Sequence, residues 1–441
     1  MYKTFIFKSY NFNKENKTLK LNYSFDNELN FTEEIVFPSK KILSNNDTEA
    51  LNNVFKYLHI VAGISYYKLF LPKKIIIETI KLDKQQADFF NSFYINGLGE
   101  FSYRNNIKNL NELINFPYDL NTKNTPNNYK LNKRYAIPVG GGKDSIVTIE
   151  TLKQFGQDFI CCSVNTAISI EKTMEIANTP SFQVKRIIDK KLLDINKNLK
   201  QYNAYNGHVP ITGILAFILC ASSIIYDYNT ILISNERSAN IGNIEFCGNN
   251  INHQWSKSFE FEKSVNEFFK RYVLENFNYI SFLRPLYEYE IARRFSKLTK
   301  YHKIFTSCNK AFKIENRLSN WCCNCDKCRF VFLILSNFLS KKELINIFSK
   351  DLLNDKNQLL GFKQLVGLTD FKPFECVGEI EESICALLNV DESFKNDYIV
   401  SVLTNELQNK YDKNDLREKY LSIKNDNNLL NMELFRHISK Q

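Results

Sequence analysis

The residues most clearly suited to chemistry are three consecutive glycines followed by Lys-Asp-Ser, at positions 140–145. They stand between an apolar run and a helical pattern, so the backbone N–H groups at the start of that helix would face the loop. Such N–H groups and the helix dipole attract anions, and glycine lets a phosphate approach the backbone closely. Lys143 adds a positive charge and Ser145 adds a hydroxyl donor. The segment therefore predicts a phosphate-binding loop.

The spacing of this loop differs from a Walker P-loop and from the GxGxxG motif. It resembles the Ser-Gly-Gly-x-Asp-Ser loop of the ATP pyrophosphatase (PP-loop) superfamily, with Gly140 in place of the first serine. That resemblance implies cleavage of ATP between the α and β phosphates and transfer of AMP to a substrate oxygen, with Mg²⁺ as the expected counterion. The residues that it implies for ATP binding are Gly140, Gly141, Gly142, Lys143, Asp144 and Ser145.

A cysteine cluster follows later in the chain, with Cys322, Cys325 and Cys328 in a Cx2Cx2C array and Cys308 before it. Four thiolates that meet at one point are the ligands of a structural Zn²⁺ ion. An iron–sulfur cluster is the alternative, although the Cys-Pro of the ferredoxin motif is absent. Cys323 lies inside the array and competes with Cys308 for the fourth ligand position. The odd total of eleven cysteines, without an evident export signal, favours reduced or metal-bound thiols over disulfides.

Two polar segments carry further reactive side chains. Asn235, Glu236 and Arg237 follow an expected strand, and an open α/β sheet binds its ligands at the carboxyl ends of its strands. His253 and Lys257 come soon after, in the segment NHQWSKSFEFE. These five residues are candidates for contacts with a substrate, and a solvated loop is the alternative interpretation.

Two isolated residues could likewise either contact a ligand or have a structural role. His208 stands just before Pro210, where it could touch a ligand or cap the helix that follows. Arg284, in FLRPLYEYE, could pair with a carboxylate or a phosphate, or it could belong to a structural ion pair.

The elements that must position these residues fall into three stretches. Residues 1–128 predict a separate N-terminal α+β domain, and residues 346–441 predict a helical C-terminal region. Between them, residues 129–345 alternate strand and helix patterns, which predicts an α/β domain with a doubly wound parallel sheet and the cysteine cluster. The expected strands are 4–12, 18–25, 32–38, 73–80, 134–140, 158–165, 182–189 and 230–236, and the expected helices include 45–70, 84–101, 171–179 and 210–228.

The composition limits the class of protein. Hydrophobic residues make up 44% of the 441 residues and aromatic residues 14%, so a sizeable core is available. The longest apolar run, 211–228, has the length of a buried helix, and the first residues do not read as a signal peptide. We therefore expect a cytoplasmic protein without a membrane partner. The net charge of +10 suits an anionic small molecule, and no Lys/Arg block is long enough to predict a nucleic-acid partner.

Taken together, several segments resemble the bacterial UDP-N-acetylmuramoyl-L-alanyl-L-glutamate epimerase (MurL) family. The resemblance runs from about residue 58 to about residue 388, and Cys323 stands where that family would have glycine. The segments that carry it include HIVAGISYYK, FYINGLGEF, VGGGKDSIVTIETL, YNGHVPIT, SNERSAN, NHQWSKSFEFE, YHKIFTSCNKAF, WCCNCDKCRFVFL and KPFECVGEIEES.

This resemblance implies an ATP-dependent inversion of the terminal L-glutamate of a UDP-muramoyl dipeptide to D-glutamate, in peptidoglycan precursor synthesis. ATP would adenylate the α-carboxylate, because a free carboxylate makes the neighbouring α-proton very weakly acidic. The expected cofactors are ATP, Mg²⁺ and a structural Zn²⁺. We assign proton transfer to His253 together with Glu236 or Lys257. The expected contacts with the substrate come from Asn235, Arg237, Arg284 and His208.

Two other functions are compatible with the same motifs. The chain could be another adenylating PP-loop enzyme that modifies a tRNA or a deazapurine. It could also be a zinc-stabilised nucleotide-binding module without catalysis.

Overall fold

The computed structural model of the chain describes residues 2–312, 318, 320–369 and 372–440. The chain divides into two compact units, each built from three segments. The first unit comprises Met1–Ala136, Phe182–Ile231 and Glu245–Tyr279, and the second comprises Ile137–Ser181, Leu232–Ile244 and Ile280–Gln441. Because the chain passes several times between the units, they differ from the consecutive domains expected from the sequence. The boundaries near residues 128 and 345 stay a prediction.

The first unit contains a mixed sheet in the strand order β7-β3-β2-β1-β4. Its strands are β1 (Thr4–Asn13), β2 (Thr18–Phe25), β3 (Leu29–Val36), β4 (Lys74–Ile77) and β7 (Ser181–Ile187). The first three form an antiparallel meander, and β4 joins β1 in parallel. Asp26 and Asn27 adopt positive φ angles of 51° and 62° between β2 and β3, as a tight hairpin of this kind requires.

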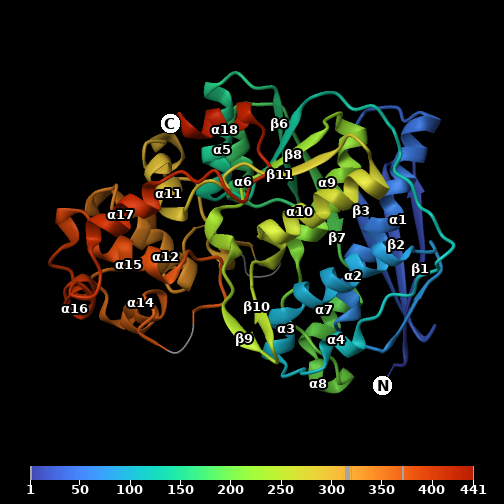
Figure 1. The fold of residues 1–441 in the computed structure, drawn as a ribbon, viewed down its shortest axis with the longest axis horizontal. Coiled ribbons are helices and arrows are strands. Elements are labelled where there is room, and N and C mark those ends of the chain that lie inside the picture. The colour runs from blue at the N-terminus through green and yellow to red at the C-terminus, as the bar shows by residue number, and fades with distance from the viewer. Residues whose placement is uncertain (1, 313–317, 319, 370–371, 441) are drawn as a thin grey trace. The chain divides into compact units, whose positions relative to one another are not determined.

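Helices pack on this sheet and on one another in the first unit. They are α1 (Asn45–Tyr67), α2 (Lys84–Gly97), α3 (Gly99–Arg104), α4 (Leu110–Leu113), α7 (Lys190–Lys197), α8 (Leu199–Tyr202), α9 (Ile211–Tyr226) and α10 (Phe259–Phe268). The long apolar helix α9 packs against α1, which in turn contacts β1 (Figure 1). The apolar run that contains it is therefore a core helix, as expected.

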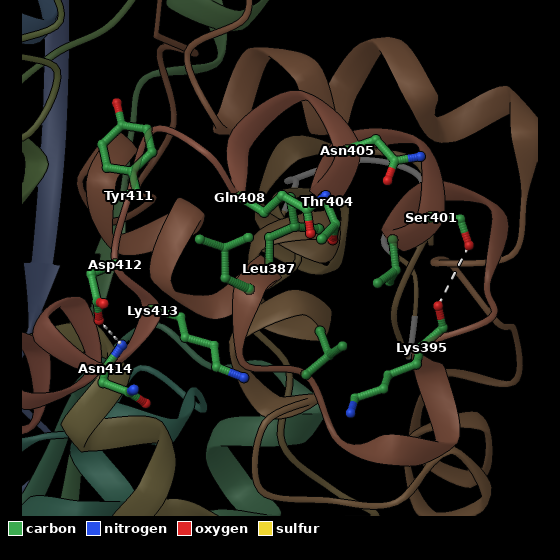
Figure 2. Close-up of a pocket in the computed structure, with 13 residues that line it drawn as sticks. Leu387, Lys395, Ser401, Thr404, Asn405, Gln408, Tyr411, Asp412, Lys413 and Asn414 are labelled. Carbon is green, nitrogen blue, oxygen red and sulfur yellow. Dashed lines mark hydrogen bonds between the residues drawn. The ribbon is translucent and has the colours of Figure 1, made fainter.

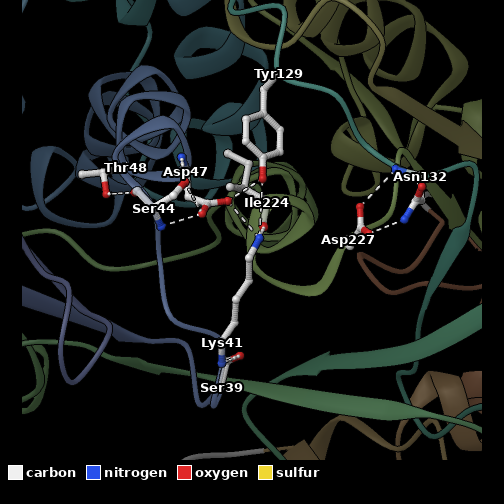
Figure 3. A network of polar contacts seen from close by, with 9 residues as sticks. All are labelled: Ser39, Lys41, Ser44, Asp47, Thr48, Tyr129, Asn132, Ile224 and Asp227. Carbon is white, nitrogen blue, oxygen red and sulfur yellow. Dashed lines mark hydrogen bonds and ion pairs between the residues drawn. The ribbon is translucent and has the colours of Figure 1, made fainter.

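A polar network fixes the beginning of α1 (Figure 3). The hydroxyl of Ser44 accepts from the backbone N–H of Asp47, and the Asp47 carboxylate accepts in turn from the N–H of Ser44. Lys41 donates to Asp47 at 2.9 Å and to the carbonyl of Ile224 at 2.7 Å, and Tyr129 also donates to Asp47. The network thereby links the first turn of α1, the last turn of α9 and the segment after residue 116.

The second unit contains the carboxyl ends of four strands in the order β11-β8-β5-β6. They are β5 (Tyr135–Pro138), β6 (Phe159–Val164), β8 (Thr230–Ile233) and β11 (Asn278–Ser281). Strands β5 and β8 pair in parallel, so the segments that follow them leave the sheet at the same edge. The helices beside these strands are α5 (Lys143–Gln154), α6 (Ile168–Ala177) and α11 (Glu288–Ser296).

The rest of the second unit is helical, as expected. Its helices are α12 (Asp326–Leu335), α13 (Lys341–Phe348), α14 (Leu359–Leu365), α15 (Ile380–Leu388), α16 (Tyr398–Leu407), α17 (Lys413–Leu421) and α18 (Met432–Ser439). Helix α12 packs against α14 and α15, and α15 packs against α16 and α17 (Figure 1). Among the described residues, no helix has the length and apolar character that crossing a bilayer requires.

The structure confirms a mixed α/β fold and departs from the expected one in two places. Strand β7 pairs antiparallel with β3, with Ile35 opposite Arg186, so the strands do not form a purely parallel sheet. That pairing joins residues far apart in the chain, which local patterns cannot reveal. The helix expected over 84–101 is broken at Leu98, between two glycines. A side chain at the first of them, Gly97, would come within 2.5 Å of the Pro210 ring, so the close approach explains the glycine.

Candidate active site and metal centre

The glycine loop links β5 to α5 in the second unit, and two of its three glycines lie where a side chain would collide with a neighbour. Gly141 adopts φ = 74°, and a Cβ atom there would collide with the Ser169 side chain. A Cβ atom at Gly142 would lie 2.6 Å from the hydroxyl oxygen of Ser307. Gly142 precedes the first residue of α5, and no side chain of the described residues caps that helix end. The loop therefore presents the N-terminus of a twelve-residue helix without a capping side chain.

Gly140 differs from the other two glycines. A Cβ atom there would have nothing within 4 Å among the described residues. Packing therefore does not explain why glycine replaces the first serine of the PP-loop pattern at this position.

Lys143 is buried and lies within a cluster of charges. Its Nζ atom pairs with the carboxylates of Asp144 and Glu288, and only 1% of its side chain is exposed. Burial lowers the pKa of Lys143, but the charges of Asp144 and Glu288 outweigh it, so the pKa lies above its usual range. Lys327 lies on the other side of Glu288, with 3.5 Å between its Nζ and Oε1. Two lysines thus share one buried carboxylate beside the loop.

The segment after β8 reaches the same cluster. Carboxylate oxygens of Asp144, Glu236 and Glu288 lie within 4.8 Å of one another and could hold a cation. Oxygen ligands of this kind suit Mg²⁺. The parallel pairing of β5 and β8 explains the arrangement, because Asp144 and Glu236 follow the ends of these two strands. Glu288, from the first turn of α11, is the member that sequence reasoning missed.

The predicted residues Asn235 and Arg237 of this segment, and Arg284 after β11, make contacts within the second unit. Asn235 is buried, and its amide lies 3.4 Å from the Ser281 hydroxyl. Arg237 donates to the Asp426 carboxylate at 2.7 Å. Arg284 is fully buried and donates to the Glu236 carbonyl at 2.6 Å and to Ser281 at 3.1 Å. These contacts of Arg284 hold the backbone of Glu236 in place.

The cysteine cluster forms a single group of donor atoms. The sulfur atoms of Cys308, Cys322, Cys325 and Cys328 all lie within 4.8 Å of one another, and none forms a disulfide. Four thiols at such distances fit a tetrahedral metal such as zinc. Cys323 is not part of the group, because its sulfur contacts the carbonyl of Phe348 at 3.1 Å. Its φ angle of 53° is in the left-handed region, which explains why glycine would suit this position.

The cluster includes the first turn of a helix that contacts the loop network, because Cys328 lies in α12. Helix α12 begins at Asp326, directly after Cys325. Lys327 in its first turn donates to the Cys376 carbonyl and pairs with Glu288. A metal at the cysteines would therefore fix the helix end that carries Lys327.

A second polar group lies in the first unit, around two of the predicted histidines. Glu100 accepts a hydrogen bond from Nδ1 of His253, and Nδ1 of His208 lies 3.6 Å from the same oxygen. The other oxygen of Glu100 accepts from Nε of Arg104 at 2.5 Å. Packing of α3 against β10 (Asn249–Ile251) brings the two chain segments together. The sequence predicts a role for both histidines but not for Glu100, which lies 153 residues from His253.

Burial keeps His208 neutral, although the charge of Glu100 acts against it. Burial lowers the pKa of His208 to about 4, and the charges of His253, Lys68 and Lys257 act in the same direction. Lys68 is held by the side chain of Asn206 and by the carbonyl of Gly207, both at 2.7 Å. Lys257 ends a short 3₁₀ helix, Trp255–Lys257.

A separate pocket of about 600 Å³ lies among the C-terminal helices (Figure 2). None of the residues predicted to bind ATP, substrate or metal contributes to its lining. The lining residues are Leu387, Leu388, Val390, Lys395, Val400, Ser401, Thr404, Asn405, Gln408, Tyr411, Asp412, Lys413 and Asn414.

Comparison with known proteins identifies the family. The model of the MurL N-terminal domain matches residues 1–282, and the model of the MurL C-terminal domain matches residues 304–418. A protein of Xanthomonas oryzae pv. oryzae is 35% identical over 90% of this chain and 88% of its own length. A protein of Salinispora tropica is 36% identical over 90% and 88%, and one of Micromonospora sp. is 37% identical over 82% and 80%. All three are named UDP-N-acetyl-alpha-D-muramoyl-L-alanyl-L-glutamate epimerase. This chain belongs to the MurL family.

Proposed function

We propose that this chain inverts the terminal L-glutamate of UDP-N-acetylmuramoyl-L-alanyl-L-glutamate to D-glutamate, in the synthesis of peptidoglycan precursors. The observation that carries the proposal is the identity of 35–37% with three proteins that bear the name of this epimerase. The enzyme is an isomerase whose substrate is an anionic small molecule. We place it in the cytoplasm and expect no nucleic-acid partner.

The inversion depends on making the α-proton of glutamate removable. A carbanion beside a free carboxylate would place two negative charges together, so the proton is held strongly. Adenylation with ATP converts the carboxylate to a mixed anhydride and releases diphosphate. A base then removes the proton, an acid returns one to the opposite face, and water releases AMP. These reaction steps explain why an epimerase would carry a loop suited to binding ATP phosphates.

The residues of the glycine loop supply the first step of the proposal. The backbone N–H groups at the N-terminus of α5, which no described side chain caps, would bind phosphate oxygens. Mg²⁺ would be held by Asp144, Glu236 and Glu288, whose carboxylates lie within 4.8 Å of one another. A cation there would compete with Lys143 for Glu288 and leave the ammonium group to contact phosphate.

The second step belongs to the proton-transfer residues. We assign it to His253, because a carboxylate positions its imidazole and an imidazole can both accept and donate a proton. Glu236 and Lys257 are the partners named from the sequence. Four further residues would bind the substrate or position the segments that bind it: Asn235, Arg237, Arg284 and His208.

Zinc has a structural role in the proposal. Cys308, Cys322, Cys325 and Cys328 would bind it with four thiolates, which leaves no open position for a substrate.

The test is a reaction of the chain with ATP, Mg²⁺ and the L,L-substrate. Glutamate released by acid hydrolysis is separated by chiral chromatography, and the nucleotide products are measured alongside. We expect D-glutamate to appear together with AMP and diphosphate, and Asp144→Ala to abolish both. Formation of ADP and phosphate, or adenylation without inversion, would contradict the proposal.

A further inference from the structure

We propose that Glu100 is a positioning residue for His253: it holds the proton on Nδ1 of that imidazole, which makes Nε2 the nitrogen that exchanges a proton with the substrate. The inference rests on the proposed function, because it concerns the proton-transfer step of that reaction. Nothing in the sequence pattern marked Glu100 for this role, since it stands between a glycine and a phenylalanine in FYINGLGEF.

The contacts of Glu100 leave little freedom for its carboxylate. The residue is 5% exposed and lies in the first turn of α3. One oxygen accepts from Arg104, four residues along the chain, and the other accepts from Nδ1 of His253. An ionised carboxylate has no hydrogen to donate, so the Nδ1 atom that faces it must carry the proton. In a neutral imidazole the Nε2 atom is then the base.

The charges around Glu100 keep it ionised. Burial raises the pKa of Glu100, but the hydrogen bonds from His253 and Arg104 outweigh it, so the pKa lies below its usual range. The carboxylate therefore stabilises positive charge on an imidazole that takes up a proton, as the buried carboxylate of a Ser-His-Asp triad does.

The second histidine does not take over this role. The rings of His208 and His253 lie 4.6 Å apart between centroids. Nδ1 of His208 is 3.6 Å from the Glu100 oxygen, too far for a good hydrogen bond. His253 is therefore the imidazole that Glu100 orients, and His208 acts as its neutral neighbour.

The experiment compares Glu100→Gln, Glu100→Asp and the wild type in two measurements. In the first, AMP formation and inversion are followed in the same reaction. Glu100→Gln should keep AMP formation within a few-fold, while inversion falls by about 10²-fold, the usual contribution of a general acid or base. Glu100→Asp keeps a carboxylate and should recover part of the loss. Glu112→Gln, an exposed glutamate in the same unit, is the matched control and should change neither.

The second measurement reads the imidazole directly. The chain has five histidines, so ¹⁵N-histidine labelling gives few signals, and His253→Gln assigns the one of interest. At a pH where the imidazole is neutral, we expect the Nδ1–H form of His253 in the wild type and a shift toward the Nε2–H form in Glu100→Gln. An unchanged tautomer, or equal losses of AMP formation and inversion, would overturn the inference.

The two measurements also separate this inference from the proposed function. A wild type that makes no D-glutamate would sink the proposed function, while the tautomer measurement would still decide whether Glu100 orients His253. Glu100, His208 and His253 also lie close enough to share a cation. Bound metal that is lost in Glu100→Gln but retained in Cys325→Ser would contradict the role given to Glu100.

Discussion

At the scale of single residues, the second unit contains a carboxyl group whose ionisation is costly. Glu382 is fully buried and accepts from the backbone N–H of Tyr289 at 2.8 Å, the hydroxyl of Ser238 at 2.9 Å and the N–H of Glu379 at 3.1 Å. Burial raises the pKa of Glu382 to about 8, and the charges of Glu288 and Glu379 add to the effect. The protonated form is therefore the one that the fold prefers below that pH.

This shift predicts how stability depends on pH. Because the pKa is higher in the folded chain than in the unfolded chain, the contribution of Glu382 is fully present below about pH 4.5 and is lost as pH rises through about 8. Its size is about 5 kcal/mol. Glu382→Gln stays neutral at every pH and does not lose this contribution. The melting temperature of the variant minus that of the wild type should therefore be larger at pH 8 than at pH 5. A difference from wild type that is the same at both pH values would contradict the prediction.

At the scale of elements, the loop before α5 gives a comparison between adjacent glycines. Gly141→Ala places a Cβ atom at positive φ and against Ser169, which costs about 1–3 kcal/mol for the backbone alone. We expect a lower melting temperature and loss of substrate-dependent diphosphate release. Gly140→Ser restores the serine of the PP-loop pattern in open space and should leave the melting temperature unchanged. Equal destabilisation by both variants would show that the loop has another conformation.

The turn before α12 gives a similar comparison for the metal. Elemental analysis should find about one zinc per chain, and Cys325→Ser should lose it and melt earlier, because four-thiolate sites contribute folding energy. Cys323→Gly should retain the zinc, since Cys323 is outside the group of sulfur atoms and its φ of 53° suits glycine. If Cys323→Gly lost the zinc and Cys308→Ser retained it, Cys323 and not Cys308 would be the fourth ligand.

At the scale of the whole molecule, the sequence predicted local structure much better than it predicted contacts between distant residues. The strands and helices around residues 140–145 and the cysteine array could be predicted because each is encoded within a few dozen residues. The parallel pairing of β5 and β8 explains why Asp144 and Glu236 meet, because the carboxyl ends of parallel strands share one edge. The antiparallel pairing of β7 with β3 and the division into two interleaved units could not be foreseen, since no local pattern fixes them.

The same limit explains the residues that were missed. Glu288 pairs with Lys143 across 145 residues, and Glu100 pairs with His253 across 153 residues. A single glutamate in a helix looks the same in the sequence whether it is solvated or buried against a cation. Only the fold gives these two carboxylates their partners.

The central claim is that ATP makes the α-proton of the terminal glutamate removable. The most direct test is a reaction in D2O with the L,L-substrate, followed by mass spectrometry and chiral analysis of the glutamate. With ATP, we predict D-glutamate that carries deuterium at the α-carbon and nowhere else, with AMP formed in parallel. Without ATP, the α-position should stay protiated. Inversion or deuterium uptake that proceeds equally well without ATP would contradict the account.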